Sequence, residues 1–564
     1  MNNQLFQQAR AAYAKKYFQG ALEVYQQCLQ DEASPLAPGE MGQLYPQMGN
    51  CLVKLKQPNE AIQAYGQAVA DEAYDARGGV HYNLGMAYAA LHDYEDAVAN
   101  FEAAASDAKY DSAYKAYTGM GNALLKMGKS AEAGVAFRNA ALDEANPDPT
   151  KALLKNAEAY RIVTDRAREF GMMVEGVSVD WSEVIGRSRK VSDRLAGGVG
   201  FLFKKNKVDS VTGEASIISP GRVEVKAADG TVNVLEGKNI LICTGCVTRT
   251  VPSLPLNGTT VIGSREAMVL EKRPESMIII GSGAIGTEFA YIYNSFGTRV
   301  TLIEALPRML PNEDDDSCMT LERAFKKQGI KVMTGASVES VTETCDGQVR
   351  ANVKNSRGQE EEITADVCLV AIGVKPVVPA APGLELTEKG FIKVNDRYAT
   401  SIPGVYAAGD VIGGVLLAHT ASFEAVQAVE GMFNPDYQPR QVGFFPSCTY
   451  CYPQVASVGK TERALKEAGV EYKVGKFPFQ AIGKAVAAGE PDGFVKTLYG
   501  AKNGELLGAH IVGPEATELI AALGIGIQAE LTDEDIHATI FAHPTLSEAI
   551  HESMLASEGI AIHM

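Results

Sequence analysis

The sequence predicts a multidomain chain, with an all-α array of helical repeats followed by an α/β fold. Three observations support this prediction: the length of 564 residues, self-similar units in the first quarter, and a glycine-rich strand–turn–helix pattern in the second half. A chain of this length is several times the usual size of one domain. With 46% hydrophobic and 21% charged residues, its composition is that of a globular protein.

Charge and cysteine content restrict the partners and the location that we expect. The formal net charge of −17 disfavours nucleic acid and anionic membranes, which both select basic surfaces. The chain begins without a basic stretch followed by an apolar run, and no segment reaches the ~18 apolar residues of a membrane span. Nine scattered cysteines form no disulfide framework. We therefore expect a cytoplasmic protein.

Residues 1–148 contain units in which small and aromatic residues recur at matching offsets. These residues are Ala9, Ala21, Tyr25 and Cys28; Gly49, Leu52, Ala61, Tyr65 and Ala68; Leu84, Gly85, Tyr88, Ala97, Phe101 and Ala104; and Gly121, Leu124, Ala133, Phe137 and Ala140. The pattern resembles the tetratricopeptide repeat, in which small residues let two antiparallel helices approach and an aromatic fills the gap to the next pair. The period is about 36 residues rather than 34, which predicts extended turns.

Such a solenoid commonly presents a concave groove to a peptide. The repeats therefore predict a protein or peptide partner. The alternative is a solenoid that has no ligand of its own.

A glycine-rich turn lies between an apolar strand and a helical pattern in the segment 277–293. Its glycines are Gly281, Gly283 and Gly286. Glycines at this spacing allow a tight turn, close approach of the backbone to a pyrophosphate and close packing of helix on strand. The helix N-terminus supplies amide donors and a positive dipole end. The pattern predicts a dinucleotide site; the alternative is a glycine-rich turn without a ligand.

A second strand, Arg299–Glu304, ends in an acid about 20 residues after the glycines. A carboxylate at this place accepts hydrogen bonds from both ribose hydroxyls, and it repels a 2′-phosphate. Glu304 therefore favours NAD over NADP. The strand from Asp366 to Gly373 is expected to close the same nucleotide domain.

Two further motifs flank this domain. The segment 404–411 contains Gly409 and Asp410, and the segment 239–245 ends in Thr244 and Gly245. They resemble motifs of the flavoproteins that bind two dinucleotides, in which the aspartate binds the sugar chain of FAD. The resemblance implies an FAD domain interrupted by an NAD domain and followed by an α+β interface domain.

Within that group the chain from Pro149 onward resembles dihydrolipoamide dehydrogenase. The matching stretches include 149–158, 187–191, 198–203 and 542–548. The implied domains are helical repeats in 1–148, a partial FAD domain in 149–265, an NAD domain in 266–394, an FAD return segment in 395–437 and an interface domain in 438–564.

The resemblance also implies roles for four residues. Lys151 corresponds to a lysine beside the flavin, and Glu288 to its ion-pair partner. His543 corresponds to the acid–base histidine, and Glu548 orients it. In this family the histidine reaches the partner subunit's flavin site, so we expect a homodimer. His419 is read as structural or close to the flavin.

Two features of a complete dihydrolipoamide dehydrogenase are not found before Lys151. These are a first glycine-rich flavin motif and a Cys-x-x-x-x-Cys pair; the chain has Ala145-Asn146-Pro147-Asp148 before Pro149. Since dihydrolipoamide is oxidised by thiol–disulfide exchange, we expect its turnover to be absent or very low. FAD binding also depends on the first motif. The pairs Cys243-Thr-Gly-Cys246 and Cys448-Thr-Tyr-Cys451 have the spacing of redox motifs, and together they could also bind a metal. We interpret them as packed free thiols.

Three interpretations follow. The chain is an NAD-dependent flavoprotein oxidoreductase with repeats fused in front, or it is a non-catalytic interaction protein with an NAD-binding, dimerising core. In the third, the junction at Asp148–Pro149 joins pieces of two genes.

Overall fold

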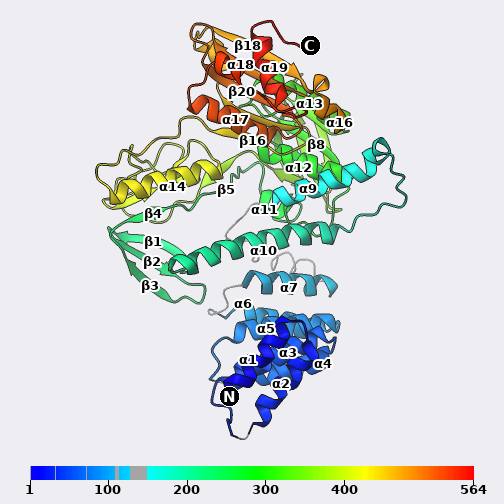
Figure 1. Cartoon of the computed structure of the whole chain (residues 1–564), viewed down its shortest axis with the longest axis vertical. Helices are drawn as coiled ribbons and strands as arrows, with labels where there is room; N and C mark the ends of the chain where they lie inside the picture. Colours follow the sequence, from blue (N-terminus) through cyan, green and yellow to red (C-terminus); the bar gives the residue numbers. More distant parts are fainter. Residues whose placement is uncertain (1, 32, 72, 108–112, 128–148, 564) are drawn as a thin grey trace. The chain divides into compact units, whose positions relative to one another are not determined.

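The computed structural model describes residues 2–31, 33–71, 73–107, 113–127 and 149–563 (Figure 1). The chain divides into two compact units, Met1–Pro147 and Asp148–Met564. Each unit is described by itself. No helix in the described ranges is both long and apolar enough to cross a membrane.

The described residues of the first unit form a succession of helices. They are α1 (Asn3–Ala14), α2 (Phe18–Gln30), α3 (Glu40–Lys54), α4 (Pro58–Val69), α5 (Arg77–Ala90), α6 (Tyr94–Ala105) and α7 (Ala113–Lys126). Lys16, Lys56 and His92 occupy the same place after α1, α3 and α5, each with a left-handed backbone (φ of 62°, 61° and 64°). Equivalent turns after every second helix are typical of a structural repeat.

Small residues bring the helices of each pair together, as the sequence predicted. A Cβ atom at Gly49 would lie 2.4 Å from the ring of Tyr65, and one at Gly85 would lie 2.6 Å from the ring of Phe101. Both rings are buried. The predicted positions Ala133, Phe137 and Ala140 lie outside the described residues.

The second unit contains a five-stranded parallel sheet in the order β6-β13-β7-β8-β9. Its strands are β6 (Val261–Ile262), β7 (Ser276–Ile280), β8 (Arg299–Glu304), β9 (Lys331–Thr334) and β13 (Val367–Val370). Helices α11 (Ser264–Ala267), α12 (Ala284–Ser295) and α13 (Asp315–Lys327) connect or flank these strands, and β10 (Ser337–Glu343), β11 (Val349–Lys354) and β12 (Glu360–Ala365) form an antiparallel sheet beside it. The near-continuous apolar sequence of β7 suits a strand buried on both faces.

The segments on either side of this sheet in the sequence form helices and small sheets. The helical elements are α9 (Thr150–Arg161), extended by η1 (Ile162–Arg166) and η2 (Ala167–Phe170), together with α10 (Trp181–Asn206), η3 (Gly409–Ile412) and α14 (Ala418–Phe433). One sheet consists of β1 (Glu214–Ser219), β2 (Arg222–Lys226) and β3 (Val232–Glu236). Strand β5 (Cys246–Thr248) pairs with β14 (Val374–Pro376). Two further strands, β4 (Ile240–Ile242) and β15 (Val405–Ala407), pair in parallel.

The C-terminal part is an antiparallel sheet covered by helices. Its order is β16-β17-β20-β19-β18, from β16 (Pro446–Thr449), β17 (Gln454–Gly459), β18 (Tyr472–Pro478), β19 (Phe494–Gly500) and β20 (Leu506–Gly513). The helical elements are α15 (Glu462–Glu467), η4 (Phe479–Ala481), α16 (Gly483–Ala487), α17 (Ala516–Gln528), α18 (Asp533–Ala538) and α19 (Glu548–Ser557). Helices α17 and α19 pack on strands of this sheet, which encloses an apolar core.

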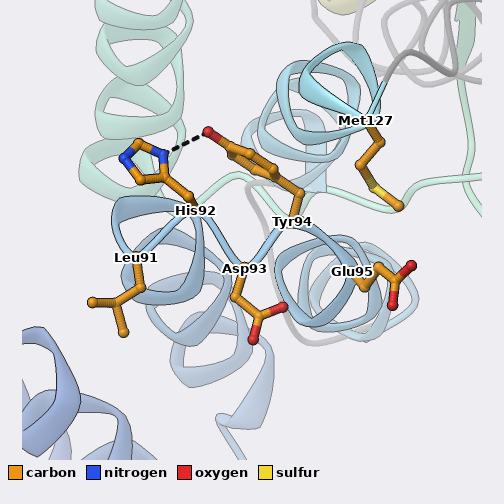
Figure 2. A pocket seen from close by; sticks show the side chains of 6 residues that line it. All are labelled: Leu91, His92, Asp93, Tyr94, Glu95 and Met127. Carbon is orange, nitrogen blue, oxygen red and sulfur yellow. Dashed lines mark hydrogen bonds between the residues drawn. The ribbon is translucent and has the colours of Figure 1, made fainter.

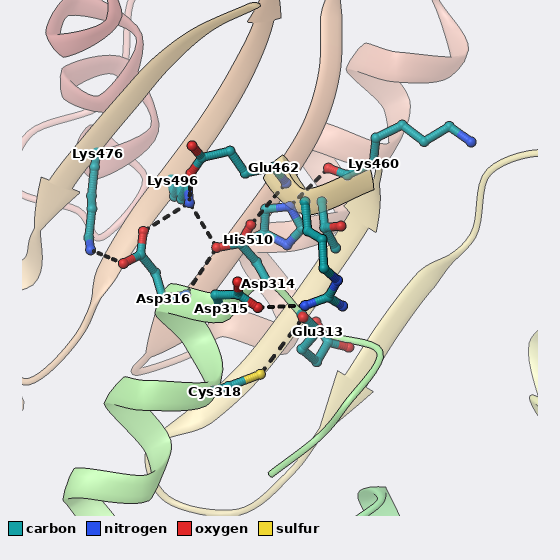
Figure 3. Close-up of polar contacts among 12 residues, drawn as sticks. Glu313, Asp314, Asp315, Asp316, Cys318, Lys460, Glu462, Lys476, Lys496 and His510 are labelled. Carbon is teal, nitrogen blue, oxygen red and sulfur yellow. Dashed lines mark hydrogen bonds and ion pairs between the residues drawn. The ribbon is translucent and has the colours of Figure 1, made fainter. Parts of the chain in front are cut away.

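A buried lysine joins the antiparallel sheet to the N-terminus of α13, a helix that flanks the parallel sheet (Figure 3). Lys496 on β19 is 1% exposed. Its Nζ lies 2.8 Å from Asp314 Oδ1, 2.8 Å from Asp316 Oδ2 and 2.7 Å from Glu462 Oε2. Asp314 also caps the N-terminus of α13 by accepting from the Asp316 N–H. One cation therefore binds three carboxylates from two separate segments of the chain.

Candidate functional site

The glycine-rich turn between β7 and α12 has the close approaches expected of a dinucleotide site. Gly281 has a φ of +98°, and a Cβ atom there would lie 2.4 Å from the Ala371 carbonyl oxygen. A Cβ atom at Gly286 would lie 1.9 Å from the Gly281 carbonyl oxygen. Gly283 caps α12 and would have no atom within 4 Å of its Cβ. The free space thus lies at the N-terminus of α12, where a pyrophosphate would be stabilised.

Glu304 lies directly beside this turn, at the end of β8. Its Oε2 accepts hydrogen bonds from the Ser282 N–H (2.8 Å) and the Ser282 hydroxyl (2.9 Å), and its Oε1 accepts from the Leu306 N–H (2.8 Å). The side chain is 8% exposed. Since a carboxylate has about four acceptor positions and three are occupied, Glu304 is held in place and retains about one position for a ribose hydroxyl. These residues fit NAD.

The two glycines should respond differently to the same added methyl group. Gly286→Ala is expected to destabilise the protein by about 1–3 kcal/mol, because its Cβ meets backbone. Gly283→Ala should leave stability unchanged but weaken NADH binding at least ~10-fold, because the methyl group enters the space for the pyrophosphate. Thermal unfolding and fluorescence titration with NADH measure the two effects. Equal loss of stability in both variants would contradict this assignment.

Lys151 on α9 contacts α12, the helix that begins at the glycine-rich turn. Its Nζ lies 2.7 Å from Glu288 Oε1 and 2.8 Å from Oε2, although the two residues are 137 positions apart. The Tyr450 N–H donates to Glu288 Oε1 (3.0 Å), and the Tyr450 ring lies 4.2 Å from Lys151 Nζ. The ion pair is thus held by a third segment.

His543 and Glu548 form the pair that the sequence suggested. His543 Nδ1 lies 2.9 Å from Glu548 Oε1, and the Thr545 N–H donates to Glu548 Oε2 (2.8 Å). Burial acts to raise the pKa of Glu548, but the hydrogen bonds from Thr545 and His543 hold this pKa below its usual value. The imidazole itself is exposed. It is accessible to a second molecule.

The two motifs around the NAD segment meet at the carboxyl ends of β4 and β15. The Thr244 hydroxyl donates to the Val377 carbonyl, and the Gly409 N–H donates to Glu424 Oε2 (2.7 Å). Burial raises the pKa of Asp410. Gly245, Gly373 and Gly409 have φ values of +67°, +102° and +76°, which favour glycine.

These residues could hold the sugar chain of a flavin dinucleotide. The Asp410 carboxylate could accept hydrogen bonds from the hydroxyls of the FAD sugar chain. The parallel sheet at this place has two strands in the described part of the chain, β15 and β4. The glycine-rich turn after β7 leaves free space for a pyrophosphate at the N-terminus of α12. His419 Nε2 lies 3.0 Å from the Pro446 carbonyl oxygen, which is a structural contact.

All nine cysteines are free. Cys448 is partly buried and Cys451 buried, and both lie near the Lys151–Glu288 pair, which the sequence did not indicate. Burial raises the pKa of Cys448 and of Cys246 to about 11. Thiols with such pKa values are poor nucleophiles at neutral pH. No group of three metal-ligating side chains occurs in the described ranges.

Three contributors were missed by sequence reasoning: Ser282, Glu424 and Tyr450. Ser282 holds Glu304, Glu424 holds the Gly409 backbone, and Tyr450 holds Glu288. Two of these contacts use backbone N–H groups, which every residue except proline has, so the residue type does not indicate them. Ser282 lies within the glycine turn, and its hydroxyl was the one available signal.

The first unit has a hollow of about 580 Å³ lined by Leu91, His92, Asp93, Tyr94, Glu95 and Met127. Figure 2 shows His92 Nδ1 paired with the Tyr94 hydroxyl (2.7 Å) at the turn between α5 and α6. The hollow is shallow and open to solvent.

The fold and the site define a protein with a parallel nucleotide-binding sheet, a flanking flavin-type segment and an antiparallel C-terminal sheet. A model of the pyridine nucleotide-disulphide oxidoreductases matches residues 132–425, and one of their dimerisation domain matches residues 445–554. A tetratricopeptide repeat model matches residues 79–106. The chain belongs to the pyridine nucleotide-disulphide oxidoreductase family.

Several relatives are similar over most of their length. Dihydrolipoyl dehydrogenase of Chlorobaculum parvum is 42% identical over 413 residues, covering 72% of this chain and 87% of that enzyme. Dihydrolipoyl dehydrogenase of Bacillus subtilis is 41% identical over 429 residues, covering 74% and 90%. The mitochondrial enzyme of Pisum sativum is 36% identical over 426 residues, covering 74% and 84%.

Solved structures share the fold. LpdA of Mycobacterium tuberculosis superposes with a TM-score of 0.67 at 24% identity, covering 72% of this chain and 89% of that one. The HOCl-induced flavoprotein disulfide reductase RclA of Escherichia coli gives 0.63 at 25% identity, covering 72% and 88%. Members of the family use FAD and NAD(P). The protein is an NAD-dependent flavoprotein oxidoreductase.

Proposed function

We propose that this protein is an oxidoreductase of the dihydrolipoyl dehydrogenase type that exchanges hydride between NAD and FAD but turns over dihydrolipoamide very slowly or not at all. The observation that carries the first part is the Lys151–Glu288 pair, with Nζ–Oε1 and Nζ–Oε2 distances of 2.7 and 2.8 Å. Glu288 lies on the helix that begins at the NAD turn, two positions after Gly286. A flavin supplies two-electron chemistry, and a fixed cation beside its ring would favour the reduced anionic form.

The second part rests on the cysteines. Oxidation of a dithiol to its cyclic disulfide releases two electrons and two protons, which an enzyme disulfide must accept. The residues directly before Pro149 contain no cysteine. Cys451 is buried with its pKa well above the usual value because of that burial, and the pKa of Cys246 is raised to about 11. Neither existing pair is suited to replace the absent one.

The remaining roles are part of the same proposal. His543, oriented by Glu548, would serve as acid–base group at the flavin site of a partner subunit in a homodimer. Gly281, Gly283, Gly286 and Glu304 would bind NAD. Thr244, Gly245, Gly373, Gly409 and Asp410 would line the join between the NAD and FAD segments. The helical repeats would recruit a protein or peptide partner in the cytoplasm.

The test is a visible spectrum of the purified chain before and after addition of NADH, followed by an assay with dihydrolipoamide and NAD. We expect a flavin spectrum that NADH bleaches, together with dihydrolipoamide turnover at least ~1,000-fold below that of a complete relative assayed in parallel. A rate equal to the relative's would refute the second part.

The second candidate is a non-catalytic scaffold, in which the repeats bind a partner and the core binds NAD and dimerises. The two-stranded parallel sheet β15-β4 favours it, because the described flavin-type segment has little parallel sheet on which to hold FAD. A colourless protein that passes no electrons from NADH to an artificial acceptor would decide for the scaffold.

A further inference from the structure

The helices of the first unit divide into two sets by charge. Helices α2, α4 and α6 contain no lysine or arginine, and their acids are Glu23, Glu60, Glu95, Asp96 and Glu102. Helices α1, α3, α5 and α7 all contain lysine or arginine, and their one acid is Glu40, the first residue of α3. The whole chain has a net charge of −17, so this basic set differs from the average of the chain.

The basic helices share a continuous face, because α3 packs on α5 and α5 packs on α7. Residues with the spacing i, i+4, i+7 and i+11 form one stripe along a helix. On α3 this stripe consists of Gln43, Gln47, Asn50 and Lys54. The equivalent stripes of α1, α5 and α7 begin at Asn3, Gly79 and Lys115. The structure describes every residue of these four stripes, and none of them is buried or acidic. We call the four stripes together the basic face.

Four cations lie on the basic face, namely Arg10, Lys54, Lys115 and Lys126. Lys54 and Lys126 occupy the last turns of α3 and α7, where a cation also stabilises the helix dipole. Lys115 is the third residue of α7, where the dipole disfavours a cation. Arg10 lies in neither terminal turn of α1. The helix dipoles therefore account for only part of this positive charge.

Amide side chains lie between the cations, and two of them are held in place. The Tyr65 hydroxyl donates to Asn50 Oδ1 (2.8 Å), and Asn83 Nδ2 donates to the same oxygen (3.4 Å). These bonds link α3 to α5. Since the oxygen of Asn50 already accepts twice, this side chain presents its N–H donors to a ligand. Such donors suit a peptide carbonyl or a carboxylate.

We propose that the basic face binds an extended acidic segment of a partner protein. The cations would form charge-assisted hydrogen bonds with Asp and Glu side chains, and the amides would bind the backbone between them. Packed helices lie about 8–10 Å apart, so the face spans about 24–30 Å from α1 to α7. At ~3.3–3.6 Å per residue, this length holds about eight extended residues. Because Arg10 lies on α1 and Lys115 and Lys126 lie on α7, the acids should occur toward both ends of the segment.

An acidic peptide fits this surface better than a nucleic acid does. A nucleic acid carries a charge at every phosphate, and some of these charges would lie beside the acids of the neighbouring helices α2, α4 and α6. A peptide can place its acids opposite the cations alone. Its recognition would define the partner that the repeats are proposed to recruit, and it rests on that part of the proposed function and not on hydride transfer.

Selection of peptides by the full chain tests the acidic preference. The immobilised chain is incubated with a phage-displayed library of random peptides of about nine residues, and the retained members are sequenced. We expect Asp and Glu to be enriched at least ~3-fold over the input library, at two or more positions. A retained peptide is then synthesised with a fluorophore. Its affinity should fall at least ~10-fold when its acids are replaced by the corresponding amides.

A charge-reversal variant locates the binding surface. Lys54→Glu combined with Lys126→Glu should weaken binding of the labelled peptide at least ~10-fold, because two exposed cations become repulsive. The matched control is Lys389→Glu with Lys502→Glu, which reverses two exposed lysines of the second unit and changes the net charge equally. This control should bind as the wild type does. Should charge reversal unfold the repeats, Lys54→Gln with Lys126→Gln removes the cations without adding repulsion and should weaken binding at least ~3-fold.

Four results would overturn the proposal. Retained peptides without enrichment of Asp and Glu would contradict it and leave recruitment by the repeats in place. Retention of no peptide at all would contradict both. Equal weakening by the charge-reversal variant and its control would show an effect of net charge and not of the basic face. Tighter binding of a thymidine oligonucleotide than of the peptide, lost in the charge-reversal variant, would assign the face to nucleic acid.

Discussion

Replacement of Lys496 by methionine is expected to destabilise the unit Asp148–Met564 by about 3–5 kcal/mol, since removing one partner leaves buried charges without compensation. Lys496 Nζ lies within 2.8 Å of carboxylate oxygens of Asp314, Asp316 and Glu462. Asp314 is itself 1% exposed, so water cannot replace the ammonium group there. Urea unfolding followed by circular dichroism measures the loss.

Lys476→Met is the control for this variant. Lys476 Nζ also pairs with Asp316, at 3.1 Å from Oδ1, but its side chain is 43% exposed. The same substitution there should cost less than about 1 kcal/mol, because exposed ion pairs contribute little. Equal destabilisation by both variants would show that the buried Lys496 cluster contributes no more to the free energy of unfolding than the exposed pair.

Lowering the pH should weaken the stabilisation that the Lys496 cluster provides. Burial acts to raise the pKa of Glu462, but hydrogen bonds from Lys466, Lys496 and Tyr472 lower it from 4.5 to about 2. A carboxylate whose pKa is lower in the folded state stabilises the fold above its unfolded pKa and loses this contribution as the pH falls. The Lys496 contribution should therefore be complete above about pH 4.5 and decline toward pH 2. The free energies of unfolding of wild type and Lys496→Met should converge over this interval.

Glu304→Ala is expected to weaken NADH binding on the order of 100-fold, which corresponds to about 2.7 kcal/mol. Its carboxylate would accept from a ribose hydroxyl through its remaining acceptor position, and a hydrogen bond to a charged group contributes about 1.5–3 kcal/mol. The variant also leaves the Ser282 and Leu306 N–H groups without their acceptor, so part of the effect would come from a disordered turn. Fluorescence titration with NADH measures the affinity.

Glu339→Ala serves as the matched control, because Glu339 is an exposed glutamate on β10 of the same domain. Its NADH affinity should equal that of the wild type. Ser282→Ala separates the two contributions of Glu304, since it removes one supporting hydroxyl and keeps the carboxylate. An unchanged affinity in Glu304→Ala would exclude this residue from the nucleotide site.

Local patterns made much of the fold predictable. The turn at Gly281, Gly283 and Gly286 is contiguous, so its chemistry can be read from spacing and residue type. The parallel neighbours β7 and β8 and the closing strand β13 follow from apolar runs of strand length. The helical pairs follow from small residues opposite Tyr65 and Phe101.

The pairing of Lys151 with Glu288 and of His543 with Glu548 was predicted from the family resemblance and not from spacing in the sequence. Tyr450 could not be found in this way, because its backbone N–H is what contacts Glu288. The position of the cysteine pair Cys448–Cys451 near Lys151 was likewise not foreseen. Contacts between segments more than 100 residues apart depend on how the sheets pack.

The sequence by itself predicted the helical repeats, the glycine-rich turn with Glu304 beside it and the family to which the chain from Pro149 belongs, because each depends on residues close together or on a recognisable order of motifs. Only the tertiary structure decided that Lys496 contacts three carboxylates, and that α10 and α14 expose large apolar side chains. The physical reason is that burial and pairing are properties of the packed elements, so a side chain's neighbours are not encoded in its local pattern.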